Sequence, residues 1–107
     1  MKLKKSCILL LCIAAFVSAP ALAQDRTGAD TFKNRCAICH GMDGLGQTPA
    51  GKIFLAASLK SPMVTHQSNR ELHDIIKNGK NKMPQFKNTL SDAQIDAVIA
   101  YVRKFSK

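Results

Sequence analysis

Residues 36–40 read Cys-Ala-Ile-Cys-His, and this C-x-x-C-H pattern constrains the chain more than any other feature. The spacing is the attachment signature of a c-type haem. The thiols of Cys36 and Cys39 can each add to one haem vinyl group, and the imidazole of His40 can then bind the iron. A fold built on this motif has to accommodate one large, mostly apolar plate. The pattern therefore predicts one haem c, held covalently through two thioethers, with iron as its metal.

The first 23 residues have the features of a secretory signal peptide. Residues 1–5 are basic, and the apolar run over residues 7–17 is too short to span a bilayer comfortably. Residues 21–23 form a small-residue A-x-A cleavage site. We expect cleavage after Ala23, which leaves residues 24–107 as one domain in the periplasm. An uncleaved membrane anchor is the alternative.

The size and charge of the remaining domain limit its function. A domain this small has a thin core and usually needs a cofactor, metal or disulfide to stabilise it. The whole chain has a formal net charge of +9, and it stays basic without its first 23 residues. That charge favours acidic protein partners or anionic membrane surfaces. Nucleic acid is a poor fit for an exported chain without a nucleic-acid-binding motif.

Hydrophobic periodicity predicts helices, and no segment shows the alternation of a strand, so the fold class is all-α. We expect helices over residues 25–36, over residues 53–59, from Ser68 to a Gly79 cap, and from Ser91 to the C-terminal region. The last two begin with capping boxes, Ser68 with Glu71 and Ser91 with Gln94. Residues 40–51 and 80–90 are expected to be loops.

A second axial ligand has to come from elsewhere in the chain if the iron is closed to substrates. The candidates are Met42, Met63, Met83, His66 and His73. Met83 is favoured because it lies in a loop between two well-capped helices, beside Pro84, which would stiffen that loop. A thioether ligand favours ferrous iron and raises the reduction potential. Met42 is too close to His40 in sequence to reach the other face of the haem, and His73 lies off the apolar stripe of its helix.

With these residues in place, the chain resembles the class I c-type cytochromes, particularly their short bacterial members, over nearly all of residues 24–107. The matching segments are the C-x-x-C-H motif and residues 81–86, which look like the family's axial methionine loop and include Phe86. Pro49 falls where the family has a proline whose carbonyl accepts the ring N–H of the axial histidine. Gly28 and Phe32, with Val98 and Tyr101, match the positions where the N-terminal and C-terminal helices cross.

This resemblance implies a small cytochrome c-like bundle of three to five helices wrapped around one covalently bound haem. It implies that His40 and Met83 bind the iron. The residues implied to contact the cofactor are Cys36, Cys39, His40, Pro49 and Phe86.

The implied function is a one-electron carrier rather than an enzyme. Its partners would be redox proteins with acidic docking surfaces, including transient contacts with membrane-bound complexes, and the carrier itself would be a monomer. The lysines that flank the proposed haem loops form either a docking ring or ordinary solvated surface; they are Lys52, Lys80, Lys82 and Lys87. One alternative is a haem enzyme or a gas or redox sensor with a displaceable sixth ligand. Another is a haem-free thiol oxidoreductase or zinc module that uses Cys36 and Cys39.

Overall fold

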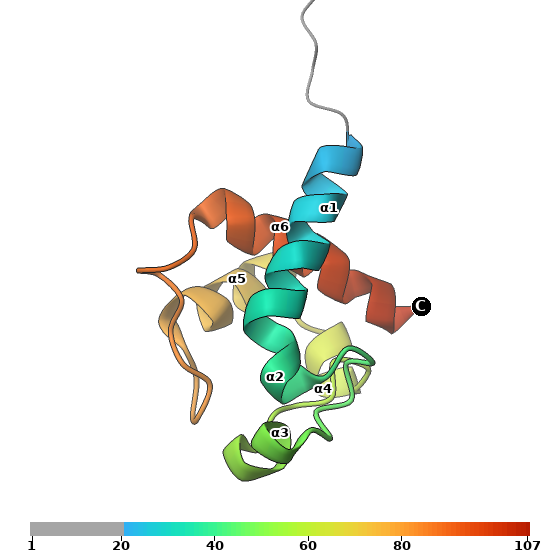
Figure 1. Ribbon diagram of the computed structural model, residues 1–107, viewed down its shortest axis with the longest axis vertical. Helices are drawn as coiled ribbons and strands as arrows, with labels where there is room; N and C mark the ends of the chain where they lie inside the picture. Colours follow the sequence, from blue (N-terminus) through green and yellow to red (C-terminus); the bar gives the residue numbers. More distant parts are fainter. Residues whose placement is uncertain (1–20) are drawn as a thin grey trace, which may run out of the picture.

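The computed structural model describes residues 21–107, with side chains from Arg26 onward, and that part of the chain contains helices and no strand (Figure 1). Most of the predicted signal peptide lies outside the described residues, so its cleavage stays a prediction. No helix within residues 21–107 is long and apolar enough to cross a membrane.

The helices form five segments over this range. Three elements run on without a break and make one N-terminal helix: α1 (Ala21–Thr31), the π-helical turn η1 (Phe32–Cys36) and α2 (Ala37–His40). The other segments are α3 (Pro49–Phe54), α4 (Pro62–Thr65), α5 (Asn69–Asn78), and α6 (Asp92–Val102) with its 3₁₀ extension η2 (Arg103–Ser106). The predicted all-α bundle is confirmed.

The N-terminal helix and α6 cross at close range (Figure 1). Gly28 makes the crossing possible, because a Cβ at this position would collide with the backbone carbonyl of Ala97. Next to it, the fully buried Phe32 packs with its ring centroid 5.0 Å from that of Tyr101. Val98, also on α6, is only 1% exposed. The predicted crossing through these positions is confirmed.

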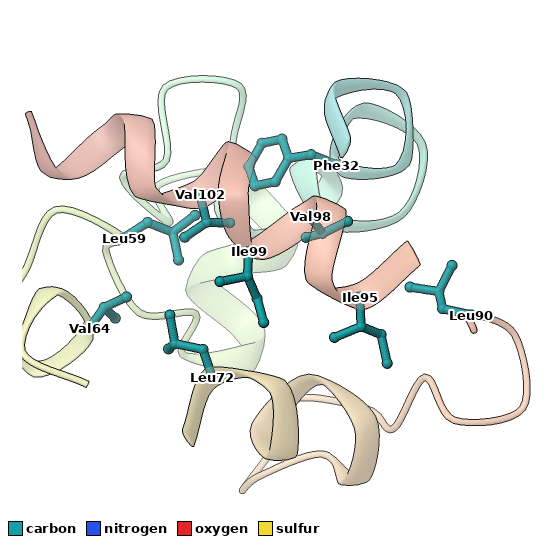
Figure 2. Close-up of a cluster of buried hydrophobic side chains, with 9 residues drawn as sticks. All are labelled: Phe32, Leu59, Val64, Leu72, Leu90, Ile95, Val98, Ile99 and Val102. Carbon is teal, nitrogen blue, oxygen red and sulfur yellow. The ribbon is translucent and has the colours of Figure 1, made fainter. Parts of the chain in front are cut away.

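The hydrophobic core is centred on α6 (Figure 2). This helix supplies Ile95, Val98, Ile99 and Val102. The N-terminal helix, α5, α4 and two connecting segments complete the cluster with Phe32, Leu72, Val64, Leu59 and Leu90. The C-terminal and N-terminal parts of the chain therefore hold the same core, and the segments between them wrap around it.

Both predicted capping boxes are present. The Ser68 hydroxyl accepts from the Glu71 N–H at 3.1 Å, and the Glu71 carboxylate accepts from the Ser68 N–H at 2.7 Å. Ser91 and Gln94 make the same reciprocal pair at 3.2 and 2.8 Å. Gly79 caps the C-terminal end of α5 with a positive φ of 76°, as predicted. The two helices on either side of the Met83 loop therefore have fixed ends.

The helix predicted over residues 53–59 is wrong. The helix in this region, α3, begins at Pro49 and ends at Phe54. Thr48 caps its N-terminus, because the hydroxyl accepts from the Gly51 N–H at 2.9 Å, and Pro49 occupies the first helical position. The helix stops because Leu55 adopts a left-handed conformation, with φ of 56°. Capping chemistry and this backbone reversal outweigh the apolar composition, and the loop after His40 ends at Thr48 rather than at Gly51.

The π turn changes the helical register immediately before the attachment motif. The Ala37 N–H bonds to the carbonyl of Phe32, five residues earlier in the chain, whereas an α-helical N–H bonds to the carbonyl four residues earlier. A π turn adds a residue to one turn of a helix. Cys36, at the end of this turn, packs at the edge of the same core that buries Phe32.

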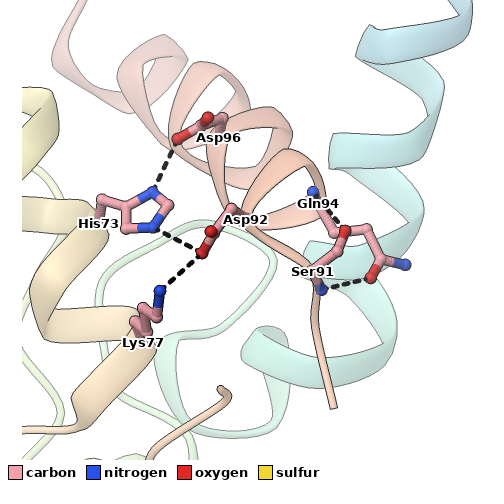
Figure 3. A network of polar contacts seen from close by, with 6 residues as sticks. All are labelled: His73, Lys77, Ser91, Asp92, Gln94 and Asp96. Carbon is pink, nitrogen blue, oxygen red and sulfur yellow. Dashed lines mark hydrogen bonds and ion pairs between the residues drawn. The ribbon is translucent and has the colours of Figure 1, made fainter. Parts of the chain in front are cut away.

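A polar network on the surface ties α5 to α6 (Figure 3). The two ring nitrogens of His73 lie 2.8 Å from the Asp96 carboxylate and 3.1 Å from that of Asp92, which also binds Lys77 at 3.1 Å. Carboxylates only accept, so both ring nitrogens can donate at the same time only when the imidazole is protonated. The hydrogen bond to Asp96, followed by the one to Asp92, raises the pKa of His73.

We predict that this network makes the stability of the protein depend on pH. Because the pKa of His73 is higher in the folded chain, its contribution is complete below the unfolded value of about 6.5 and is lost as the pH rises through the folded value. In His73→Asn, the urea midpoints measured at acidic and at mildly alkaline pH should therefore differ less than they do in the wild type. The matched control is His66→Asn, because His66 is exposed and outside the network. A pH profile of His73→Asn that parallels the wild type would refute the prediction.

Candidate haem-binding site

The predicted attachment residues lie on a single helical turn. Cys36 is the N-cap of α2, Cys39 lies in its body and His40 is its last residue. Both cysteines are free thiols and are half-buried. The structure therefore brings together two available thiols and an imidazole on one turn, as the motif predicts.

The imidazole of His40 is held by the main chain. Its Nδ1 lies 3.0 Å from the carbonyl oxygen of Ala57, seventeen residues further along the chain. A carbonyl can only accept, so Nδ1 carries the proton and Nε2 keeps its lone pair. Burial lowers the pKa of His40, although the Ala57 bond acts in the opposite direction. The ring is therefore a neutral imidazole at neutral pH, in the tautomer that can bind a metal through Nε2.

Pro49 does not have the predicted role, because the carbonyl that accepts the His40 ring proton belongs to Ala57. Pro49 is exposed and is the first residue of α3. The chain has to complete α3 and reverse at Leu55 before its backbone passes the imidazole. The predicted bond is real, but its acceptor lies in the segment that follows α3.

The Met83 loop is tied closely to its surroundings. Lys80 and Met83 exchange backbone hydrogen bonds of 3.2 and 2.9 Å around a tight turn, in which Asn81 has a positive φ of 53°. Gly79 allows the loop to return close to α5, because a Cβ there would lie 2.7 Å from the Met83 carbonyl oxygen. Further along, the Phe86 N–H bonds to the Ile76 carbonyl at 3.1 Å. The Met83 side chain is half-buried within this tied loop.

One contact joins the Met83 loop to the segment that packs on the attachment turn. The ammonium group of Lys82 lies 3.5 Å from the carbonyl oxygen of Ile53, near the end of α3. Because α3 packs against α2, this contact places the methionine loop beside the same part of the molecule. Phe86 is half-buried and packs against the edge of the core. Its predicted contact with the cofactor stays a prediction.

The other candidate ligands are less well placed. Met42 and Met63 have 55% and 66% of their surfaces exposed. His66 is also exposed, and both ring nitrogens of His73 are occupied by carboxylates on α6. Met83 is the candidate that combines partial burial with a fixed loop.

The environment of the thiols does not suit thiol–disulfide catalysis. Burial, and to a lesser extent the neighbouring Cys39, raises the pKa of Cys36 to about 11. Catalytic cysteines have lowered pKa values, because the thiolate is the nucleophile. No strand precedes the motif, and no cluster of three or more His, Cys, Asp or Glu side chains suited to a metal ion is found within the described residues. These observations favour haem attachment over the thiol oxidoreductase and the zinc module.

Sequence reasoning missed two residues of the site, Ala57 and Thr48. Ala57 acts through its carbonyl, and a main-chain contact leaves no signal in residue type. Thr48 does have a signal, since Thr before Pro at the start of a helix is a recognised pattern. Its hydroxyl also donates to the carbonyls of Ile38 and Cys39 in the attachment turn.

Comparison with known proteins shows the family to which the chain belongs. The family described as "Cytochrome C oxidase, cbb3-type, subunit III" matches residues 23–102. Cytochrome c6 of Synechococcus sp. is 37% identical over 98 residues, covering 87% of this chain and 81% of the relative. Cytochrome c6 of Nostoc sp. is 39% identical over 99 residues, covering 89% and 86%. The chain belongs to the class I c-type cytochromes.

The fold leads to the same family. The solved structure of the KustC0563 c-type cytochrome superposes with a TM-score of 0.68 at 27% identity, covering 75% of this chain and 98% of that one. This cytochrome therefore carries haem c with its iron, as the motif predicts, and its function is electron transport. The free thiols of Cys36 and Cys39 are suited to haem attachment, and the His40 tautomer with its proton on Nδ1 leaves Nε2 for the iron.

We predict that Cys36→Ser reduces the yield of stable holoprotein, because one of the two thioether links is lost. The measurement is the haem that stays with the polypeptide after acid-acetone extraction, for protein matured in a periplasm with haem-attachment machinery. Ala37→Ser is the matched control, since it changes the adjacent position and keeps both thiols. A normal yield of covalently bound haem in Cys36→Ser would exclude Cys36 as an attachment residue.

Proposed function

We propose that this cytochrome is a periplasmic one-electron carrier with one haem attached through Cys36 and Cys39. In this proposal His40 and Met83 are the two axial ligands. Haem supplies reversible one-electron chemistry at its iron when it is bound. The observation that carries the proposal is the Nδ1 contact of His40 with Ala57, because it leaves Nε2 free and oriented by the protein.

The fixed Met83 loop supports electron transfer rather than catalysis on a substrate. A thioether from Met83 and an imidazole from His40 would occupy both axial positions, leaving none for a substrate. The loop is held by the Lys80 backbone pair, by the Phe86 bond to α5 and by the Lys82 contact with α3. Small ligand movement between the two oxidation states is what a fast carrier needs. This arrangement disfavours the alternative, an enzyme or sensor with a displaceable sixth ligand.

The surface charge supports a transient acidic partner. The four lysines beside the proposed haem loops are all exposed, namely Lys52, Lys80, Lys82 and Lys87. None of them has a carboxylate partner within the described part of the chain. Surface lysines without a carboxylate partner are available to steer an acidic protein, which increases the association rate more than the affinity. We propose brief encounters of a monomeric carrier with redox proteins, including membrane-bound complexes.

Export to the periplasm is supported by the N-terminal sequence. Basic residues, a short apolar run and the A-x-A site precede the domain, and cleavage after Ala23 would leave residues 24–107 as the cytochrome c domain. The family match begins at residue 23, close to this position.

We predict that Met83→Ala keeps the haem attached but opens the iron. The oxidised protein should lose the weak long-wavelength absorption band of iron–methionine ligation, its reduction potential should fall, and the reduced protein should bind CO. Met63→Ala is the matched control, because Met63 is largely exposed outside the loop. An unchanged spectrum and potential in Met83→Ala would reject Met83 as a ligand. CO binding by the wild type would instead favour the sensor or enzyme.

We predict that electron transfer to an acidic redox protein slows as salt increases. Steering by complementary charge raises association rates by about 10- to 1,000-fold and is screened by salt. Stopped-flow rate constants should therefore fall by about tenfold or more from low salt to about 0.5 M. Lys80→Gln with Lys82→Gln should weaken this dependence, whereas Lys104→Gln with Lys107→Gln, at the C-terminus, should not. Equal salt dependence in both double variants would remove the loop lysines from the docking surface.

A further inference from the structure

The backbone carbonyls of the four residues of α2 are all hydrogen-bonded, but two of them depend on one side chain. The Ala37 carbonyl accepts from the Gly41 N–H at 2.8 Å, and the His40 carbonyl accepts from the Gly46 N–H at 2.7 Å. The carbonyls of Ile38 and Cys39 both accept from the hydroxyl of Thr48, at 2.6 and 3.1 Å. The last carbonyls of a helix have no partner within the helix, so outside donors have to satisfy them.

Thr48 has a second bond that fixes its position relative to α3. Its hydroxyl oxygen accepts from the Gly51 N–H at 2.9 Å while its proton is directed at the two carbonyls. Gly51 lies directly against this junction, because a Cβ there would collide with the Cys39 carbonyl and lie 2.6 Å from the Gly46 carbonyl oxygen. One hydroxyl therefore links the end of the attachment turn to the start of α3 at a point where the two backbones touch.

We propose that Thr48 is a positioning residue for the axial histidine, an inference that rests on the proposed function of His40. The imidazole is fixed at two places, its ring through Ala57 and its backbone through the turn that Thr48 holds. The Gly46 N–H holds the His40 carbonyl itself, and the carbonyls of Ile38 and Cys39 before it are held by Thr48. In this proposal the Thr48 hydroxyl keeps that part of the turn in place and so sets the direction in which Nε2 would meet the iron.

Three substitutions separate this role from simple capping of α3. Thr48→Ser keeps both the donor and the acceptor. Thr48→Asp keeps the acceptor, and Asp is a good N-cap, but an ionised carboxylate cannot donate to the two carbonyls. Thr48→Val keeps the shape and loses both functions. Thr89→Val is the matched control, since the Thr89 hydroxyl also donates to a carbonyl, that of Phe86, in another loop.

The readouts are the haem methyl resonances of the oxidised holoprotein and its EPR g values, which report the orientation of the axial imidazole, alongside the urea midpoint. We expect both spectroscopic signatures to shift in the Asp and Val variants and to stay at the wild-type values in Thr48→Ser and Thr89→Val. Absence of holoprotein for Thr48→Asp, with normal Thr48→Ser holoprotein, supports the same conclusion, because Asp lacks only the donor. Wild-type signatures in Thr48→Asp would overturn the proposal, whatever its urea midpoint. Wild-type protein without a low-spin histidine signature would instead refute the proposed function of His40.

Discussion

The close crossing of the N-terminal helix with α6 is the contact on which the remaining structure depends. Gly28 lets the two backbones touch at Ala97, and Phe32 fills the space beside them without any exposed surface. This crossing joins the two ends of the domain and fixes the direction of the helix that carries Cys36, Cys39 and His40. The π turn begins at the buried Phe32 and ends at Cys36, so the crossing and the attachment motif lie on one continuous helix. The packing of the core therefore fixes the position of the haem-binding segment.

The sequence predicted the parts of this protein that depend on local chemistry. The capping boxes at Ser68 and Ser91 were found because Ser and a Glu or Gln three residues later satisfy the same backbone groups wherever they occur. The attachment motif was found for a similar reason, since its chemistry requires fixed spacing. The boundaries of α3 differ from the prediction, because the Thr48 cap starts the helix before the apolar run over residues 53–59 and because nothing in the residue type of Leu55 predicts a left-handed backbone.

The partner of His40 shows where sequence reasoning stops. The expectation that a carbonyl would orient the ring was sound, but any residue has a carbonyl, and only the path of the backbone decides which one arrives. The family resemblance implied Pro49 as the acceptor, whereas the carbonyl that reaches the ring belongs to Ala57. The contact between His73 and its two carboxylates has the same origin, because residues 73, 92 and 96 meet only after α5 and α6 have packed. Tertiary contacts of this kind carry no local pattern.

The loop that holds Met83 argues for a carrier on mechanical grounds. Its backbone cannot lift away from α5 without breaking the Phe86–Ile76 and Lys87–Lys77 bonds, and the Lys80–Met83 pair closes the turn within the loop. Gly79 brings the loop so near to α5 that little space remains for an alternative path. A sensor needs a sixth ligand that leaves easily, so its loop should have few bonds to the scaffold. A loop held by several bonds suits a carrier, because it would keep the proposed Met83 ligand in one position through each change of oxidation state.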